Sequence, residues 1–340
     1  MVLSEKEEKI LKSIVVASEN DPNKPEFPAE NPNFPATPTY KIEVPGFSNV
    51  WLKDESVNPT GTHKDRMAWE MVVTYRDFLL AKKRGQVKEP LRPMSIISLG
   101  AAALAIQTQM KKYNLPNLKV LIDINILDPI SIDSLKRIGC EIYDMGSAKK
   151  PLNWDEILML THNPNGFEIT SNRALDPSTR YYDWMSYEII NSSPDYCFIP
   201  FGTGNLYENI LNINKKEVSS SEHDPRFRGD VDILRNCNFI GASSNNPKSK
   251  AIKLYWPYIP SVHFNEQWMR VYRSAGFCGQ QSNVQIIKEG FLEKAMDTAE
   301  SQNVTCEYSG IAGLAMMLQM KNRLPRNKKM LVINTGKTKY

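Results

Sequence analysis

One lysine of this sequence lies where its amine could act as a nucleophile. Lys64 follows the turn-forming run Asn-Pro-Thr-Gly (58–61) and begins a segment with a helical pattern. An amine attacks a carbonyl only in its neutral form, so such a lysine needs a lowered pKa. We expect the positive end of the following helix to lower the pKa of Lys64. Without further context, a solvated lysine in a charged first turn is the commoner interpretation.

Two glycine-containing turns follow short apolar runs and could bind anions. In Ser-Leu-Gly-Ala (98–101), backbone amides before an alanine-rich helix are open to a carboxylate. In Phe-Gly-Thr-Gly-Asn-Leu (201–206), Gly202 and Gly204 let the backbone bend sharply before a helix whose first amides could hold a phosphate. Each turn alone is equally compatible with a packing turn. The second is not a dinucleotide fingerprint, because a third glycine is absent.

A hydroxyl group follows the last predicted strand. Thr335, in Val-Ile-Asn-Thr-Gly-Lys (332–337), could hydrogen-bond a pyridine nitrogen without supplying a full positive charge. Alone, this segment is also typical of any strand that ends in turn residues. Ligands of parallel α/β sheets collect at the carboxyl ends of strands, beside helix N-termini. We therefore predict that the lysine, the two turns and this hydroxyl serve one ligand.

These segments need a scaffold of alternating strands and helices. Short β-favouring runs lead into helical patterns, which predicts βαβ units with mostly parallel, twisted sheets. Expected strands cover 49–53, 95–98, 119–125, 141–144, 196–200, 238–242 and 330–334. Expected helices cover 65–84, 101–112, 130–138, 205–213, 248–255, 291–301 and 310–321. A charged helix is expected at 3–18, an extended arm at 21–38, and a polar surface insertion at 215–232.

Length and composition favour an ordinary protein of two domains. The chain has 340 residues, whereas single cores rarely grow past about 250–300 residues. A net charge of +4 without a concentrated basic stripe gives no indication of nucleic-acid binding. Five widely separated cysteines without a Cys-x-x-Cys pair favour reduced thiols. No metal site is expected, because His162, His223 and His263 have no partners at ligand spacing.

The sequence predicts a cytoplasmic protein that does not cross a membrane. Its first residues carry charge where a signal peptide would need an apolar core. The longest uncharged run, 93–110, includes serine, threonine and glutamine, so a buried strand, turn and helix suit it better than a membrane span.

The lysine segment is the most specific match to a known family. Thr-Pro-Thr-Tyr (37–40) and the stretch Val-Trp-Leu-Lys-Asp-Glu to Lys-Asp-Arg (50–66) resemble the fold-type II pyridoxal-phosphate enzymes. That family includes tryptophan synthase β, cysteine synthase, threonine synthase and serine/threonine dehydratases. The pattern Leu-Lys-Asp-Glu, Asn-Pro-Thr-Gly, Lys-Asp-Arg is most similar to threonine synthases. The resemblance continues through 98–105, 119–146, 198–206, 307–315 and 333–336.

The resemblance implies an α/β fold of two domains with three αβα layers. It also implies pyridoxal 5'-phosphate as the cofactor, joined as an imine to Lys64, which would later move protons at the substrate's Cα. Thr335 would face the pyridine nitrogen, and His63 lies where tryptophan synthase β has a histidine that touches the phosphate. The residues that would hold the phosphate are Gly202, Thr203, Gly204, Asn205 and Leu206.

The turn that would bind the substrate carboxylate departs from the family pattern. That turn usually reads Ser-Ser-Gly-Asn or Ser-Thr-Gly-Asn, and its asparagine bonds the ring oxygen of the cofactor. The matching residues here are Ser98, Leu99, Gly100 and Ala101. Ala101 cannot make that bond, and Leu99 lacks a hydroxyl. We expect carboxylate binding by the amides to persist and the tuning of the cofactor ring to change.

Three functions are open at this point. The resemblance implies a homodimeric, threonine-synthase-like lyase that performs elimination or replacement at the β or γ carbon of an amino acid, a small-molecule substrate. A serine/threonine ammonia-lyase is the alternative among enzymes. A cofactor-binding protein without catalysis, serving as a regulatory or interaction module, is favoured by Leu99 and Ala101 and opposed by Lys64 and Thr335.

The expected domains follow the same resemblance. A smaller α/β domain is expected at 80–160. A larger, cofactor-binding α/β domain is expected to combine 36–79 with 161–340. The N-terminal helix and arm are expected to occupy 1–35.

Overall fold

The computed structural model describes residues 36–85, 93–122, 124, 129–144, 167–168, 182–255 and 283–340. They form two compact units. The larger unit contains the described residues of 36–63 and 182–339, and the smaller contains those of 64–168 together with residue 340.

The larger unit is built on a six-stranded sheet. Its strand order is β1 (Thr39–Ile42), β2 (Val50–Asp54), β10 (Met330–Asn334), β7 (Tyr196–Pro200), β8 (Asn238–Ser243) and β9 (Asn283–Ile286). Only β1 runs antiparallel to its neighbour, and the other pairs are parallel. All five residues of β10 are buried, as expected of an apolar strand in the middle of a covered sheet.

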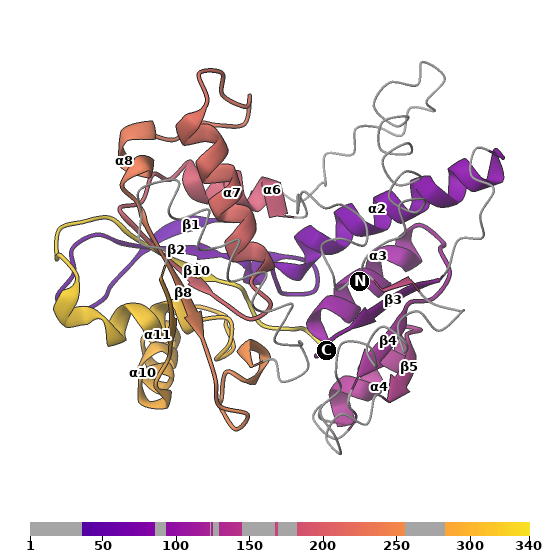
Figure 1. The fold of residues 1–340 in the computed structure, drawn as a ribbon. Coiled ribbons are helices and arrows are strands. Elements are labelled where there is room, and N and C mark those ends of the chain that lie inside the picture. Colours follow the sequence, from indigo (N-terminus) through magenta and orange to yellow (C-terminus); the bar gives the residue numbers. More distant parts are fainter. Residues whose placement is uncertain are drawn as a thin grey trace. The chain divides into compact units, whose positions relative to one another are not determined.

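Helices cover both faces of this sheet (Figure 1). One layer contains α6 (Asp183–Ile190) and α7 (Asn205–Ser219), and the other contains α10 (Glu289–Glu300) and α11 (Ala312–Gln319). The shorter helices are η1 (Glu55–Val57), α8 (Val231–Arg235), η3 (Ile252–Leu254) and η4 (Lys321–Arg323). The predicted three-layer αβα arrangement is confirmed, and it leaves the carboxyl ends of the parallel strands for the turns described below.

The smaller unit contains a four-stranded, fully parallel sheet. Its strand order is β5 (Glu141–Asp144), β4 (Lys119–Ile122), β3 (Met94–Ile97) and β6 (Phe167–Glu168). The helices are α2 (Lys64–Lys83), α3 (Ala101–Lys112) and α4 (Pro129–Arg137). Because α2 packs on α3, this unit begins at Lys64, whereas the smaller domain was expected to begin at 80. The expected boundary at 160/161 lies outside the described residues.

Several elements lie where the sequence predicted them. α3, β5, β7 and β10 begin and end at the predicted residues. The predicted helix at 248–255 is wrong, because only the single turn η3 forms there. The amide of Lys253, which a helix over this range would bond to the Ser249 carbonyl, donates instead to the Ser309 hydroxyl at 3.3 Å. The helix predicted at 3–18 and most of the arm at 21–38 lie outside the described residues.

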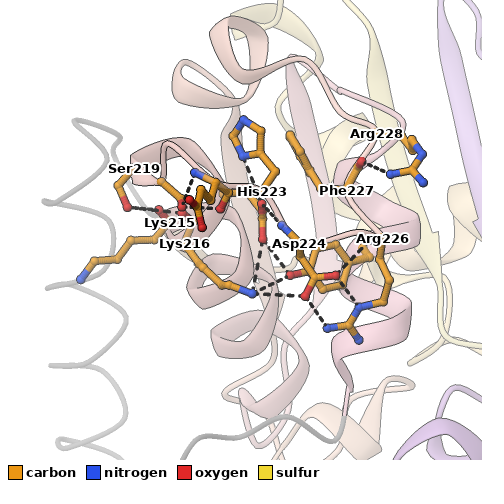
Figure 2. Close-up of polar contacts among 12 residues, drawn as sticks. Lys215, Lys216, Ser219, His223, Asp224, Arg226, Phe227 and Arg228 are labelled. Carbon is orange, nitrogen blue, oxygen red and sulfur yellow. Dashed lines mark hydrogen bonds and ion pairs between the residues drawn. The ribbon is translucent and has the colours of Figure 1, made fainter. Parts of the chain in front are cut away.

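The polar segment 215–232, which we predicted to be a surface insertion, contains helical residues at both ends and a well-bonded loop between them. Helix α7 continues to Ser219, and a network of ion pairs holds the loop that follows (Figure 2). Its buried centre is Glu217, which accepts hydrogen bonds from the Tyr187 hydroxyl at 2.8 Å and the Asp224 amide at 3.2 Å. His223 lies 3.3 Å from the same carboxylate. The segment is therefore held against α6 by the hydrogen bond between Tyr187 and Glu217, which its local sequence does not reveal.

Asp224 and Arg226 form the best-aligned pair of this network. Two guanidinium nitrogens of Arg226 each donate to Asp224 at 2.9 Å (Figure 2). The guanidinium also lies 4.3 Å from the centre of the Tyr187 ring. The hydrogen bonds from Arg226 hold the pKa of Asp224 below its ordinary range. Two parallel charge-assisted bonds of this kind are among the stronger polar interactions in proteins.

We expect Asp224→Asn to lower the free energy of unfolding near neutral pH by ~1–2 kcal/mol. Because folding depresses the pKa of Asp224, its contribution is present above the unfolded value of about 4 and is lost as the pH falls further. The variant should therefore lose stability less steeply in acid than the wild type does, as denaturant unfolding at several pH values would show. Asp232→Asn, at an exposed ion pair with Arg235, is the control and should change little.

Three properties of the described residues bear on the class of protein. Cys140, Cys197, Cys237 and Cys306 are free and buried. No group of three His, Cys, Asp or Glu residues in the described ranges is arranged to hold a metal ion. None of the helices in these ranges combines the length and the apolar character that a membrane span requires.

Candidate active site

A hydrogen-bonded turn leads the chain into Lys64. The Asn58 side chain donates to the Glu55 carboxylate at 2.6 Å and to the Glu55 carbonyl at 3.0 Å. The amide of Gly61 then donates to the Asn58 carbonyl at 2.9 Å, with Gly61 at a φ of 84° that disfavours side chains. The Asn-Pro-Thr-Gly run therefore forms the predicted turn, and its glycine is needed for the backbone conformation.

The turn at 58–61, here called the lysine turn because it leads into Lys64, is hydrogen-bonded to the segment that follows β10. The amide of His63 donates to the Thr335 carbonyl at 3.1 Å, and the amide of Lys337 donates to the Gly61 carbonyl at 2.9 Å. Gly61 and Gly336 approach so closely that a Cβ on Gly336 would overlap the Gly61 carbonyl. The fold thus joins the residue directly before Lys64 to Thr335, although about 270 positions separate them in the sequence.

Lys64 has the lowered pKa that a nucleophilic amine requires. It is the first residue of α2 and its side chain is partly buried. Burial disfavours the charged ammonium and lowers the pKa of Lys64 to about 8. We had attributed the lowering to the positive end of the helix, and the structure shows instead that desolvation is the cause.

This pKa predicts how fast Lys64 reacts at each pH in the protein without cofactor. Its reaction with an amine-selective acylating reagent, followed by mass spectrometry of the modified peptide, should rise with a midpoint near 8. The depressed pKa of Lys64 also makes the free energy of unfolding rise with pH between about 8 and 10.5, because only the unfolded chain binds that proton there. A Lys64 midpoint near about 10.5, the value of a lysine in a model peptide, would contradict the assignment.

The glycine turn before α7 can hold an anionic group. The amide of Phe201 donates to the Ala242 carbonyl at 2.8 Å, which carries the chain from β7 along the end of β8. Gly204 precedes the helix with a φ of 84°, and the first helical bond runs from the Glu208 amide to the Gly204 carbonyl at 2.8 Å. The start of a helix attracts anions, because the positive ends of its peptide dipoles lie there. This turn therefore suits a phosphate, whose binding here stays a prediction.

The second predicted anion turn, at 98–101, lies in the smaller unit. Some of its backbone amides donate to a side chain of the same turn. The Ser98 hydroxyl accepts the amides of Gly100 at 3.0 Å and Ala103 at 3.3 Å. Gly100 has a φ of 108° and its carbonyl accepts the Leu104 amide. Ser98 therefore shapes the turn, and the first amides of α3, at Ala101 and the next residue, are the donors that could bind a carboxylate.

His63 is held by contacts that the sequence did not reveal. Its ring stacks on Tyr182 with centroids 5.5 Å apart and planes 25° apart. Its Nδ1 lies 3.4 Å from the Thr335 carbonyl. Tyr182 is buried directly before the first residue of α6. The structure thus brings His63 together with Thr335 and Tyr182.

The comparisons with known proteins identify the family. Residues 33–228, more than half of the chain, match the family model described as "Pyridoxal-phosphate dependent enzyme". The chain belongs to this family. Its cofactor is therefore pyridoxal phosphate, as predicted. No curated protein matches the sequence.

Several solved structures share the fold at low sequence identity. The O-acetylserine-dependent cystathionine β-synthase from Helicobacter pylori is 14% identical with a TM-score of 0.63, and 89% of this chain and 93% of that one are covered. O-acetylserine sulfhydrylase isoform 3 from Entamoeba histolytica is 15% identical with a TM-score of 0.61, covering 93% and 90%. An aspartate racemase is 13% identical with a TM-score of 0.60, covering 96% and 94%. These enzymes differ in reaction, so the likeness establishes the fold alone.

The residues of this chain suit the cofactor. A lysine with a pKa of about 8 can condense with an aldehyde, the amides that open α7 can take a phosphate, and Thr335 offers a hydroxyl at the end of β10. When bound, pyridoxal phosphate supplies an electron sink for reactions at the Cα of an amino acid.

Proposed function

We propose that this enzyme acts on an amino acid by elimination or replacement at the β or γ carbon, in the manner of threonine synthase. The observation that carries the proposal is the hydrogen bond between His63 and Thr335. It holds the segment that leads into Lys64, whose amine has a pKa of about 8, to the segment after β10. The pattern of residues 50–66, most similar to threonine synthases, supports the finer assignment. Two of the similar structures are enzymes named for O-acetylserine, an amino acid with a leaving group on its β carbon.

The residues would divide the work by their chemistry. Lys64, neutral for about half of the molecules near pH 8, can remove the proton from the substrate's Cα and later return it. The first amides of α3 would orient the substrate carboxylate, and those of α7 would hold the cofactor phosphate through Gly202, Thr203, Gly204, Asn205 and Leu206. Thr335 would bond the pyridine nitrogen without adding a full positive charge.

The reaction can be tested on the purified full-length chain loaded with pyridoxal phosphate. Amino acids that carry hydroxyl, acetyl or phosphate groups on the β or γ carbon are added one at a time while the visible absorption is followed. We expect at least one of them to change the spectrum and to yield a new amino acid when a second nucleophile is present. Release of ammonia and a keto acid from serine or threonine would instead identify an ammonia-lyase.

The substitutions at Leu99 and Ala101 favour a different second candidate, a cofactor-binding regulatory or interaction module. In that case the absorption would be unchanged by every amino acid tried, while the cofactor stayed bound. The homodimer and the cytoplasmic location stay predictions, which light scattering of the purified protein and cell fractionation would check.

A further inference from the structure

A single buried amide links the two segments that meet beside Lys64. Asn334, the last residue of β10, is 0% exposed. Its Nδ2 donates to the Asp54 carboxylate and to the Thr305 carbonyl, both at 2.9 Å, and its Oδ1 accepts the Gly336 amide at 3.0 Å. Both amide hydrogens and the carbonyl oxygen are therefore used, which fixes the orientation of this side chain.

The bond from Asn334 to Gly336 shapes the backbone around Thr335. An asparagine oxygen that accepts the amide two residues later closes an Asx turn, which limits the conformations of the residue between them. That residue is Thr335, whose carbonyl receives the His63 amide at 3.1 Å. The orientation of the Asn334 side chain therefore restricts the backbone of Thr335. The hydrogen bond to Thr335 in turn restricts His63, the residue next to Lys64.

Asp54 makes the corresponding connection on the lysine side. It ends β2 directly opposite Asn334 in the parallel register, and it is buried. Its Oδ1 also accepts the Ser56 amide at 2.9 Å, and its Oδ2 accepts the Tyr40 hydroxyl at 3.1 Å. The bond from the Ser56 amide makes Asp54 the N-cap of η1. The chain then continues through the Asn-Pro-Thr-Gly turn to Lys64. A buried carboxylate with three donors is stable and rigid.

We propose that Asn334 and Asp54 are positioning residues, whose hydrogen bonds hold the lysine turn and Thr335 in register for the cofactor. The proposal rests on the proposed function, because the register matters only if Lys64 and Thr335 engage the same ligand. It assigns a purpose to a polar pair that ends two strands whose buried residues two positions earlier, Leu52 and Val332, are apolar. Two apolar residues would pack there without linking the turns.

The test compares Asn334→Ala with a matched control, Asn214→Ala. Asn214 is also fully buried in the larger unit, but it lies in α7 and bonds the Leu234 carbonyl. In the full chain without cofactor, hydrogen exchange at the amides of His63 and Gly336 should accelerate at least ~10-fold in Asn334→Ala. Its Lys64 modification midpoint should move from near 8 toward 10.5. Asn214→Ala should lower the melting temperature and change neither measurement.

Asn334→Asp is a second, more conservative variant. It tests the proposal on its own if the alanine variant does not fold. A second carboxylate beside Asp54 is repelled when ionised, but when protonated it can donate to Asp54 and still accept the Gly336 amide. Exchange at His63 should therefore match the wild type near about pH 5 and exceed it near neutral pH. The nearby titratable groups Tyr40 and Cys306 have pKa values raised by burial, the latter to about 12, so neither titrates in this range.

The outcomes separate the two proposals. Unchanged exchange and an unchanged Lys64 midpoint in Asn334→Ala, or a pH-independent effect in Asn334→Asp, would overturn the positioning role. Absence of a covalent link between the wild-type chain and pyridoxal phosphate would overturn the proposed function. The exchange measurements need no cofactor, so they judge the positioning pair in either case.

Discussion

Lys64→Ala is expected to abolish the covalent attachment of pyridoxal phosphate and to lower turnover by roughly 10³-fold or more. Lys64 alone combines the position after the lysine turn with a pKa lowered to about 8 by burial. Its removal takes away both the amine that bonds the aldehyde and the base that moves the Cα proton. Reduction of the loaded protein with borohydride, followed by mass spectrometry, would locate the attachment.

Lys83→Ala is the matched control for this prediction. Lys83 lies at the exposed end of the same helix, α2, and should keep both the cofactor and the activity. Cofactor that stays covalently bound to Lys64→Ala, at another lysine, would show that the wrong amine has been assigned. Melting temperatures of both variants would establish that neither result reflects unfolding.

Gly336→Ala is expected to separate the lysine turn from the end of β10. Gly336 has a φ of 99°, and an added Cβ would overlap the Gly61 carbonyl. A strained backbone and a forced contact each cost about 1–3 kcal/mol, so the free energy of unfolding should fall by ~2–6 kcal/mol. Cofactor binding should weaken as well, because the Thr335 and His63 backbones can no longer keep their hydrogen bond.

Gly85→Ala separates the two causes of that effect. Gly85 also has a positive φ, 74°, but nothing lies within 4 Å of a Cβ built there. It should show only the cost of the backbone conformation, measured by denaturant unfolding. Equal losses in the two variants would mean that the close approach of Gly61 and Gly336 is unimportant.

Local sequence was sufficient for the scaffold and for the types of group in the site. The run Met-Leu-Val-Ile-Asn predicted β10 to the residue, since a central parallel strand must be apolar on both faces. The glycine turn at 201–206 and the start of α7 followed from the same kind of short-range pattern. Local signals failed at 248–255, where the amide of Lys253 donates to the side chain of the distant Ser309 instead of to a helical carbonyl. They failed again at 215–232, which is held by contacts to Tyr187.

The motifs of the sequence by themselves determined which residue types could bind the cofactor, because a lysine after a turn and a glycine turn before a helix are local patterns. Tertiary structure alone decided how those groups are tuned and joined. Burial, rather than the helix end, lowers the pKa of Lys64, and burial depends on what the whole chain packs around it. The Asn334–Asp54 bond spans 280 positions, and the stack of His63 on Tyr182 joins two distant segments. Such contacts carry no periodic signature, because they are set by the strand register and helix packing that only the complete fold provides.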